Sequence, residues 1–155
     1  MITKGLLEYI AKRFLLHLII VVSAISVLSK EDSTLPESDI ELLSKLITSE
    51  CGICPTEEKY LVGSVVLNRL EDDKFPNSVE GVISQNRQFD GYLTNQFVRS
   101  LESDKVAKNL ALGENKTPHI FYFVREDLSN NKKFINFIKS GPFIKAKYHT
   151  FKIGL

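Results

Sequence analysis

Residues 63–89 read GSVVLNRLEDDKFPNSVEGVISQNRQF, and the fold that we expect is built outward from this stretch. Apolar side chains recur at helical spacing up to Leu70, which predicts a helix that begins after Pro55 and Thr56. Pro76 then interrupts the chain, and Ser78 is placed to start a short second helix. The core-facing stripe of the longer helix would consist of Leu61, Val62, Val65, Val66 and Leu70.

A further helix is predicted upstream, over Asp39–Glu50. Ser38 stands three residues before Glu41, the spacing of a capping box in which each side chain bonds the backbone amide of the other. The pattern also predicts a carboxylate on the core-facing side of this helix. Helical periodicity places Glu50 on the same face as three apolar residues, Leu43, Leu46 and Ile47.

The remainder of the chain adds one more helix and a small β element. Ser103 can cap a helix that Gly113 closes in the left-handed conformation. Runs of β-branched and aromatic residues at Ile120–Val124 and Tyr148–Ile153 indicate two strands. Residues 85–95 contain Gly, Asn, Asp and Gln without a period, as expected of a loop. We therefore expect an α+β fold, mainly α, in a single domain.

The N-terminal segment differs in composition from the rest of the chain. Residues 14–28, FLLHLIIVVSAISVL, form an apolar run, which predicts an apolar helix. By the positive-inside rule, the basic residues before the run keep the N-terminus in the cytoplasm and send the following domain across the membrane. A cleaved export signal and a short membrane anchor both fit this pattern, and a buried amphipathic helix is the alternative. The basic residues are Lys4, Lys12 and Arg13.

Two segments are expected on this basis. Residues 29–37 are polar and contain a proline, which is typical of a tether, so residues 1–37 are expected to form the signal or anchor together with this tether. Residues 38–155 are expected to form the folded domain.

The charge balance limits the classes of partner. The chain has 20 basic and 19 acidic side chains and a net charge of +1. No long-range field therefore recruits nucleic acid, and a substrate must be recognised locally by shape and hydrogen bonding. We expect a monomer that uses no cofactor and binds no nucleic acid.

Glu50 is the candidate catalytic residue. Partial burial favours the protonated carboxyl, because water no longer solvates the anion, and such a group can protonate a glycosidic oxygen. The alternative is that the helix ends at Glu50 and its side chain turns into water, as most glutamates do. Periodicity alone favours this alternative.

Four stretches nevertheless resemble the SleB/CwlJ family of cell-wall hydrolases in order and spacing. They are DIELLSKLITSE, GSVVLNRLEDDKFPNSVEGVISQNRQF, IFYFVRE and KYHTF; the first begins at Asp39 and the last contains His149. The resemblance implies a lysozyme-like, lytic-transglycosylase-like domain that cuts the sugar backbone of peptidoglycan, with Glu50 as its general acid. Some members of the family are lytic transglycosylases, which need one carboxyl. Asp90 is the candidate for the second carboxyl that hydrolysis ordinarily uses, but it is more typical of a turn.

The resemblance also implies roles for other residues. Four are expected to contact substrate, although core packing is an equal alternative for Phe89, and a bond to a backbone carbonyl within a β turn is favoured for His149. Asn68 and Arg69 lie in the VVLNR signature and are expected to support the structure by capping or ion pairing. The four expected substrate contacts are Gln88, Phe89, Tyr122 and His149.

The chain departs from the family directly after Glu50, where it reads CGICPTEE. Cys51 and Cys54 form a lone C-x-x-C that can close a disulfide in an oxidising compartment, and its redox state is a hypothetical gate for activity. Zinc binding by this pair with His119 and His149 is disfavoured, because the histidines are far apart in sequence and show no local pattern. We therefore expect no metal site.

Two other function classes are left open. An exported module with the same shape but without catalysis would hold glycan strands or join an envelope assembly. Glu50 argues against it, since a carboxyl on an apolar face costs stability. A small redox protein lacks the expected βαβ pattern around its C-x-x-C.

Overall fold

The computed structural model describes residues 34–85, 89 and 100–155. The apolar run at residues 14–28 and the helix predicted there lie outside the described residues. Within the described part, no helix combines the length and apolar character needed to cross a bilayer. The described residues belong to one compact unit, which runs from Ser33 to Leu155.

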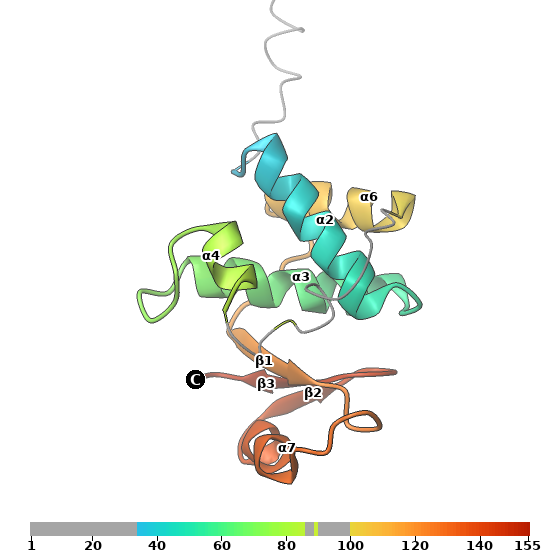
Figure 1. The fold of residues 1–155 in the computed structure, drawn as a ribbon, viewed down its shortest axis with the longest axis vertical. Helices are drawn as coiled ribbons and strands as arrows, with labels where there is room; N and C mark the ends of the chain where they lie inside the picture. Colours follow the sequence, from blue (N-terminus) through green and yellow to red (C-terminus); the bar gives the residue numbers. More distant parts are fainter. Residues whose placement is uncertain (1–33, 86–88, 90–99) are drawn as a thin grey trace, which may run out of the picture. The chain divides into compact units, whose positions relative to one another are not determined.

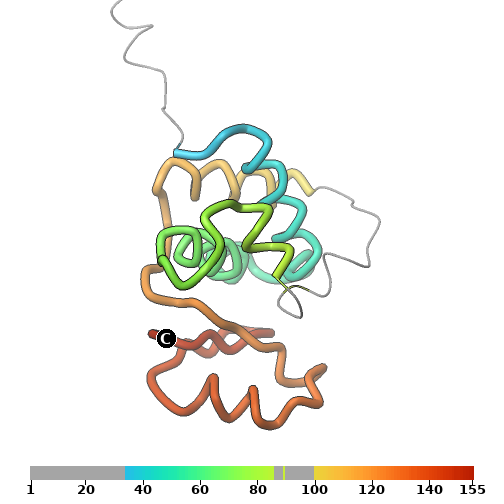
Figure 2. The backbone as a smooth tube through the Cα atoms, turned by 60° about the vertical axis from the view of Figure 1, so that its left-hand side comes forward, coloured from blue at the N-terminus to red at the C-terminus, as the bar shows by residue number. Residues whose placement is uncertain are grey.

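Among the described residues, four helices form a layer on one side of a small sheet, and a fifth lies on the other side (Figures 1 and 2). The layer supplies most of the hydrophobic core. It contains α2 (Glu37–Cys51), α3 (Thr56–Leu70), α4 (Val79–Ile83) and α6 (Leu101–Ala111), and the fifth helix is α7 (Lys132–Lys139).

The core forms where the predicted apolar stripes of α2 and α3 meet. Leu43, Leu46 and Ile47 are fully buried on α2, as are Val62, Val65 and Val66 on α3. A Cβ atom at Gly63 would collide with the side chains of Ile47 and Leu110. The glycine therefore lets α3 approach both α2 and α6 closely.

Two predicted helix starts are wrong and two local predictions are confirmed. α2 begins at Glu37 with Pro36 at its N-cap and no side-chain cap, so Ser38 lies inside the helix instead of starting a capping box. In α6 the cap is Ser100, whose hydroxyl accepts from the amide of Ser103 at 3.0 Å. Ser78 does cap α4, and Gly113 has a φ of +80°, as expected of a helix end.

The sheet has three antiparallel strands in the order β1-β3-β2. The predicted strand at residues 148–153 begins later, at Thr150, because the preceding amides bond a carboxylate instead of a strand. The pattern analysis did not predict α7 or β2. The strands are β1 (Ile120–Val124), β2 (Phe143–Lys145) and β3 (Thr150–Ile153).

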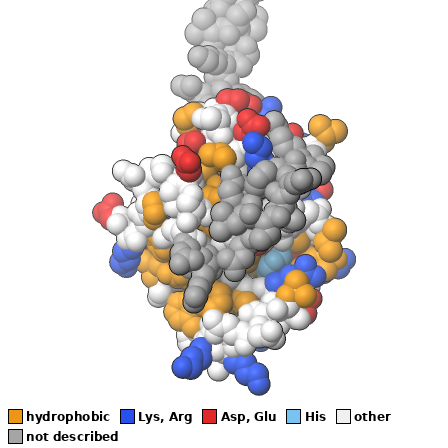
Figure 3. Space-filling model, viewed as in Figure 1, with side chains coloured by type: hydrophobic (Ala, Val, Ile, Leu, Met, Phe, Trp, Pro, Cys, Tyr) orange, Lys and Arg blue, Asp and Glu red, His pale blue; other side chains and the backbone are white. Residues whose placement is uncertain are grey.

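Hydrogen bonds of Glu126 link α7 to β2 and β3. It accepts from Lys139 at 2.5 Å, from Thr150 at 2.5 Å and from Lys145 at 3.0 Å. These three donors, Lys139 foremost, lower the pKa of Glu126 to about 2. Figure 3 shows acidic side chains gathered at the α2 end of one face, with basic ones among them, and basic side chains at the opposite end below the sheet.

Candidate active site

Glu50 lies in the last turn of α2. The helix continues through this residue to Cys51, and the side chain is half-buried. Its Oε1 atom is shielded from solvent, as is the hydroxyl oxygen of the neighbouring Ser49. The side chain therefore does not turn fully into water, and it keeps the partly buried position that a general acid requires.

A disulfide between Cys51 and Cys54 closes the turn that follows Glu50. The two Cα atoms are 5.1 Å apart, and the amide of Cys54 donates to the carbonyl of Cys51 at 3.1 Å. A Cβ atom at Gly52 would lie 2.8 Å from the carbonyl oxygen of Thr48, so the tight turn needs a glycine there. The disulfide thus constrains the end of the helix that carries Glu50.

A second glutamate, Glu58, lies in the first turn of α3 and is only 2% exposed. Its Oε1 accepts from the amides of Tyr148 at 3.0 Å and His149 at 2.7 Å. The same oxygen lies 2.8 Å from Nδ1 of His149. The hydrogen bonds of Glu58 therefore link the first turn of α3 to the residues directly before β3.

His149 is equally buried, at 2% exposure. Desolvation lowers the pKa of His149, and it outweighs the opposing effect of the hydrogen bond to Glu58. The neutral imidazole can donate from Nδ1 to the carboxylate, which is its partner in place of the expected backbone carbonyl. The ring packs edge-on against Phe123, with centroids 5.3 Å apart.

The expected substrate-binding residues do not share one environment. Phe89 is 2% exposed and packs against Phe123 at 6.1 Å between centroids, so it belongs to the core. Tyr122 is half-buried on β1 and meets the Phe137 ring edge-on at 5.3 Å. Gln88 lies outside the described residues, as does Asp90.

Asn68 and Arg69 make contacts that fit the supporting role expected of them. The Asn68 amide donates to the carbonyls of Thr117 and Ile120, each at 2.9 Å. Nε of Arg69 donates to the Phe121 carbonyl at 2.8 Å. Both residues therefore hold the end of α3 against β1 and the segment before it.

Arg69 is also surrounded by aromatic rings. Its guanidinium carbon lies 5.1 to 5.3 Å from the ring centroids of Phe75, Phe89 and Tyr122. Burial lowers the pKa of Arg69 to about 10, so the side chain stays charged at neutral pH. Cation–π contacts of this kind stabilise a buried charge.

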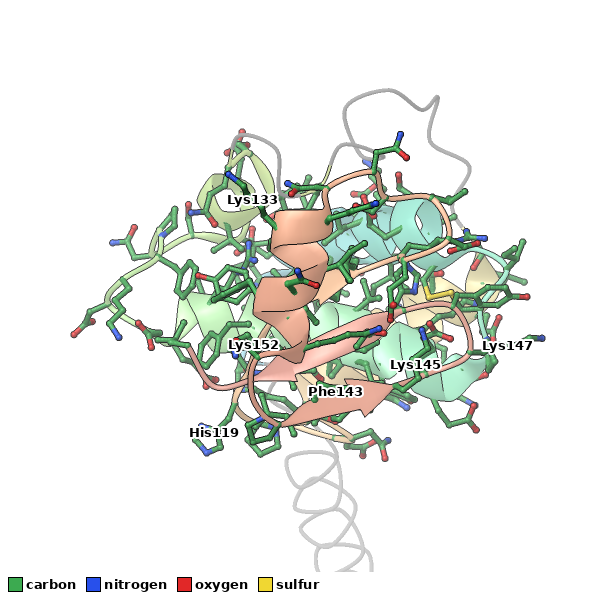
Figure 4. All side chains as sticks on the ribbon, turned by 90° about the horizontal axis from the view of Figure 1, so that it is seen from below. His119, Lys133, Phe143, Lys145, Lys147 and Lys152 are labelled. Carbon is green, nitrogen blue, oxygen red and sulfur yellow. A yellow bond between two sulfur atoms is a disulfide. The ribbon has the colours of Figure 1, made fainter. Side chains whose placement is uncertain are left out.

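The structure also gathers potential metal ligands that the sequence separates. Cys51, Cys54, Glu58 and His149 are all buried, and one donor atom from each lies within 4.8 Å of the others. His149 lies close to the two cysteines although it is far from them in sequence, because β3 begins beside the first turn of α3. His119 lies on the opposite side of the view from the disulfide (Figure 4).

Sequence reasoning missed Glu58, although a signal for it was present. Glu58 precedes Val62 by four residues and Val65 by seven, so it shares their helical face. Its place in the first turn suggested only a favourable interaction with the helix dipole. The periodicity test that singled out Glu50 would also have singled out Glu58.

Comparison with known proteins identifies a family. The profile of the family described as Cell Wall Hydrolase matches residues 54–152. The spore cortex-lytic enzyme of Bacillus cereus is 29% identical over 100 residues, which cover 62% of this chain and 38% of the relative. The chain therefore spans about two fifths of the length of this curated relative.

Two solved structures are similar to the described domain. The catalytic domain of the germination-specific lytic transglycosylase SleB from Bacillus anthracis has a TM-score of 0.65 and 26% identity, covering 76% of this chain and 96% of that domain. The catalytic domain of the Bacillus cereus SleB protein has a TM-score of 0.63 and 27% identity, covering 76% and 91%. The family profile begins at residue 54, so Glu50 lies outside the range that it matches.

Proposed function

The chain belongs to the cell wall hydrolase family, and on this premise we propose that it cleaves the glycan strands of peptidoglycan with Glu50 as its single general acid and base. The observation that carries the proposal is the position of Glu50. It is half-buried at the end of α2, with one carboxyl oxygen shielded, in a domain similar to a lytic transglycosylase catalytic domain.

One carboxyl is sufficient for the proposed reaction. The Glu50 carboxyl donates its proton to the glycosidic oxygen, and the bond from that oxygen to the muramic acid C1 breaks. The 6-hydroxyl of the same muramic acid then attacks C1 and returns its proton to the Glu50 carboxylate. The products are a free 4-hydroxyl on one sugar and a 1,6-anhydro ring on the other.

The remaining groove contacts are part of the same proposal. Gln88 would bond sugar hydroxyl or N-acetyl groups, and the half-buried Tyr122 would contribute its phenol. Phe89 and His149 are each 2% exposed, so we assign them support of the groove in place of direct contact. Asn68 and Arg69 hold the underlying helix and strand together.

The test compares the products of three proteins on purified peptidoglycan: the full chain and its Glu50→Gln and Glu57→Gln variants. Glu57 is exposed in the first turn of α3 and serves as a matched control. Mass spectrometry should find 1,6-anhydromuramic ends with the full chain and the control but none with Glu50→Gln, because an amide has no carboxylic proton to donate.

Other products would change the proposal. Reducing ends that depend on Glu50 would indicate hydrolysis and direct attention to Asp90 as a second carboxyl. If all three folded proteins released no fragments from several peptidoglycan types, the enzyme proposal would be wrong. A catalytically inactive glycan-binding or envelope-assembly module would then be the better account.

We also propose that residues 14–28 export the domain or anchor it at the outer face of the cytoplasmic membrane. The support is the apolar run behind three basic residues. Fractionation of cells that express the full chain tests this. Substitution of two apolar residues in the run by Asp should leave the protein in the cytoplasm.

A further inference from the structure

Four side chains with metal-binding chemistry meet beneath the turn that follows Glu50. Cys51 ends α2, Cys54 lies in the turn, Glu58 belongs to α3, and His149 directly precedes β3. All four are buried, and one donor atom from each lies within 4.8 Å of the other three. Two cysteine sulfurs, joined here in a disulfide, an imidazole and a carboxylate thus converge from three parts of the chain.

We propose that these four side chains bind a zinc ion when both cysteines are reduced. In a tetrahedral zinc site, Zn–S bonds of about 2.3 Å and Zn–N or Zn–O bonds of about 2.0 Å place the ligand atoms roughly 3.3 to 3.8 Å apart. Donor atoms that already lie within 4.8 Å of one another reach this geometry with side-chain movements of about 1 Å.

The donor set selects the class of metal. Two thiolates and an imidazole are soft or borderline ligands, which favour zinc over the oxygen-seeking calcium and magnesium ions. The four protein groups fill a tetrahedral coordination shell, as in structural zinc sites, and leave no position for a catalytic water. The proposed ion therefore has a structural role, and Glu50 remains the acid.

The surface of the turn provides an entry path. Gly52 and Ile53 are exposed, with Ile53 at 73%, whereas Cys51 and Cys54 lie directly beneath them at 1% and 6%. A local opening of this short turn exposes the cluster without separating the helices. Metal exchange therefore does not require unfolding of the core.

The disulfide and the zinc site exclude each other, because both use the two Cys sulfurs. In oxidation by a small-molecule disulfide, one Cys thiolate attacks a reagent sulfur and releases the first reagent thiolate. The second Cys thiolate attacks the mixed disulfide and releases the other, so two electrons pass to the reagent. The zinc ion leaves without a change of charge.

The two forms connect different parts of the fold. The disulfide joins Cys51 to Cys54 within one turn, whereas zinc joins that turn to His149 across most of the domain. Closing a long loop restricts the unfolded chain more than closing a short one. Zinc should therefore stabilise the reduced protein more than the disulfide stabilises the oxidised one.

The experiment uses the full chain reduced with a phosphine, freed of the reagent without oxygen, and mixed with ZnCl₂. Bound metal is measured after gel filtration by elemental mass spectrometry, and CoCl₂ provides a spectroscopic probe. The comparison proteins are the oxidised chain, the Cys51→Ser/Cys54→Ser double variant and His119→Ala. The last removes a histidine that lies outside the cluster.

About one zinc per chain is expected in the reduced wild type and in His119→Ala, and none in the oxidised chain or the double variant. Cobalt should show thiolate charge-transfer bands and tetrahedral d–d bands, and zinc should raise the unfolding temperature by about 5 °C or more.

Circular dichroism is recorded alongside, so that folding is known for each protein. The proposal is wrong if the reduced wild type, still folded, binds no more zinc than the double variant. It is also wrong if the oxidised chain binds as much as the reduced one, because the cysteine sulfurs would then not be ligands. If reduction itself unfolds the wild type and added zinc does not restore its circular dichroism, the proposal fails as well. None of these three results depends on whether the chain cleaves peptidoglycan.

Discussion

The end of α2 and the beginning of α3 each present a glutamate on a core-facing side, and the two carboxyls are held differently. Glu58 is 2% exposed. Its carboxylate accepts hydrogen bonds from the amides of Tyr148 and His149 and lies within hydrogen-bond distance of Nδ1 of His149. Glu50 is half-buried, and its Oε1 is shielded from solvent. Helical spacing marks both positions equally, and only the tertiary structure distinguishes them: Glu58 is fully buried, whereas Glu50 is half-buried.

The comparison also explains why burial alone is a poor guide to catalysis. A carboxylate that is almost fully buried and bound by several donors is held in place and cannot reach a substrate, as at Glu58. A partly shielded carboxyl that borders solvent can exchange protons with a substrate. We therefore propose that Glu58 stabilises the fold and that Glu50 takes part in the reaction.

The largest effect is expected on catalysis in Glu50→Gln. Its rate of peptidoglycan cleavage should fall by about a hundredfold to ten-thousandfold, because the proton donor is lost. Its free energy of unfolding should stay within about 0.5 kcal/mol of the wild type. Turbidity loss of a peptidoglycan suspension and urea denaturation measure the two quantities. Retained activity in Glu50→Gln with loss in Glu58→Gln would reverse the assignment.

Glu58→Gln should show the opposite pattern. The amide NH₂ group would face backbone donors in a buried place, which should cost about 3 kcal/mol of unfolding free energy. Activity per folded molecule should change little. Urea denaturation against the exposed control Glu57→Gln measures the difference. Equal stability of the two variants would mean that the Glu58 hydrogen bonds contribute little.

At the other end of α3, Arg69 is expected to stabilise the fold as Glu58 does at the beginning of the helix. Arg69→Lys removes the planar group that contacts three aromatic rings and the Phe121 carbonyl, and should cost about 1 to 3 kcal/mol. Arg125→Lys is the control, because Arg125 is half-exposed and pairs with an exposed Asp127. Thermal unfolding of both variants checks this, and a larger loss in the control would contradict the role given to Arg69.

The smallest effect concerns Glu126, a half-buried carboxylate with three donors. Its pKa is lowered from 4.5 to about 2, so its contribution to stability is fully present above pH 4.5 and is lost as the pH falls towards 2. The difference in urea midpoint between wild type and Glu126→Gln should shrink over this window. Asp127→Asn is the matched control, and a difference that persists unchanged at pH 2 would contradict the prediction.

Local pattern predicted the elements that carry strong periodicity. The apolar stripes of α2 and α3, the short α4 after Pro76 and the β1 run all lie where expected. α7 was not predicted although Phe134 and Ile138 recur at helical spacing, because its eight residues are fewer than the window over which helical periodicity is usually read. β2 has only three residues, too few for an alternating pattern to predict a strand, and it is recognised as a strand by its pairing with β3.

The sequence by itself determined the helical core, the position of Glu50 on a core-facing side and the cysteine pair beside it, because these depend on spacing within one helix and one turn. Only the tertiary structure decided the partners of Glu58, the burial of Phe89 and the meeting of His149 with the two cysteines. Those contacts join residues up to 98 positions apart, as between Cys51 and His149 (149 − 51). Periodicity within one helix or strand cannot predict such contacts, because they form only when the sheet packs against the helices.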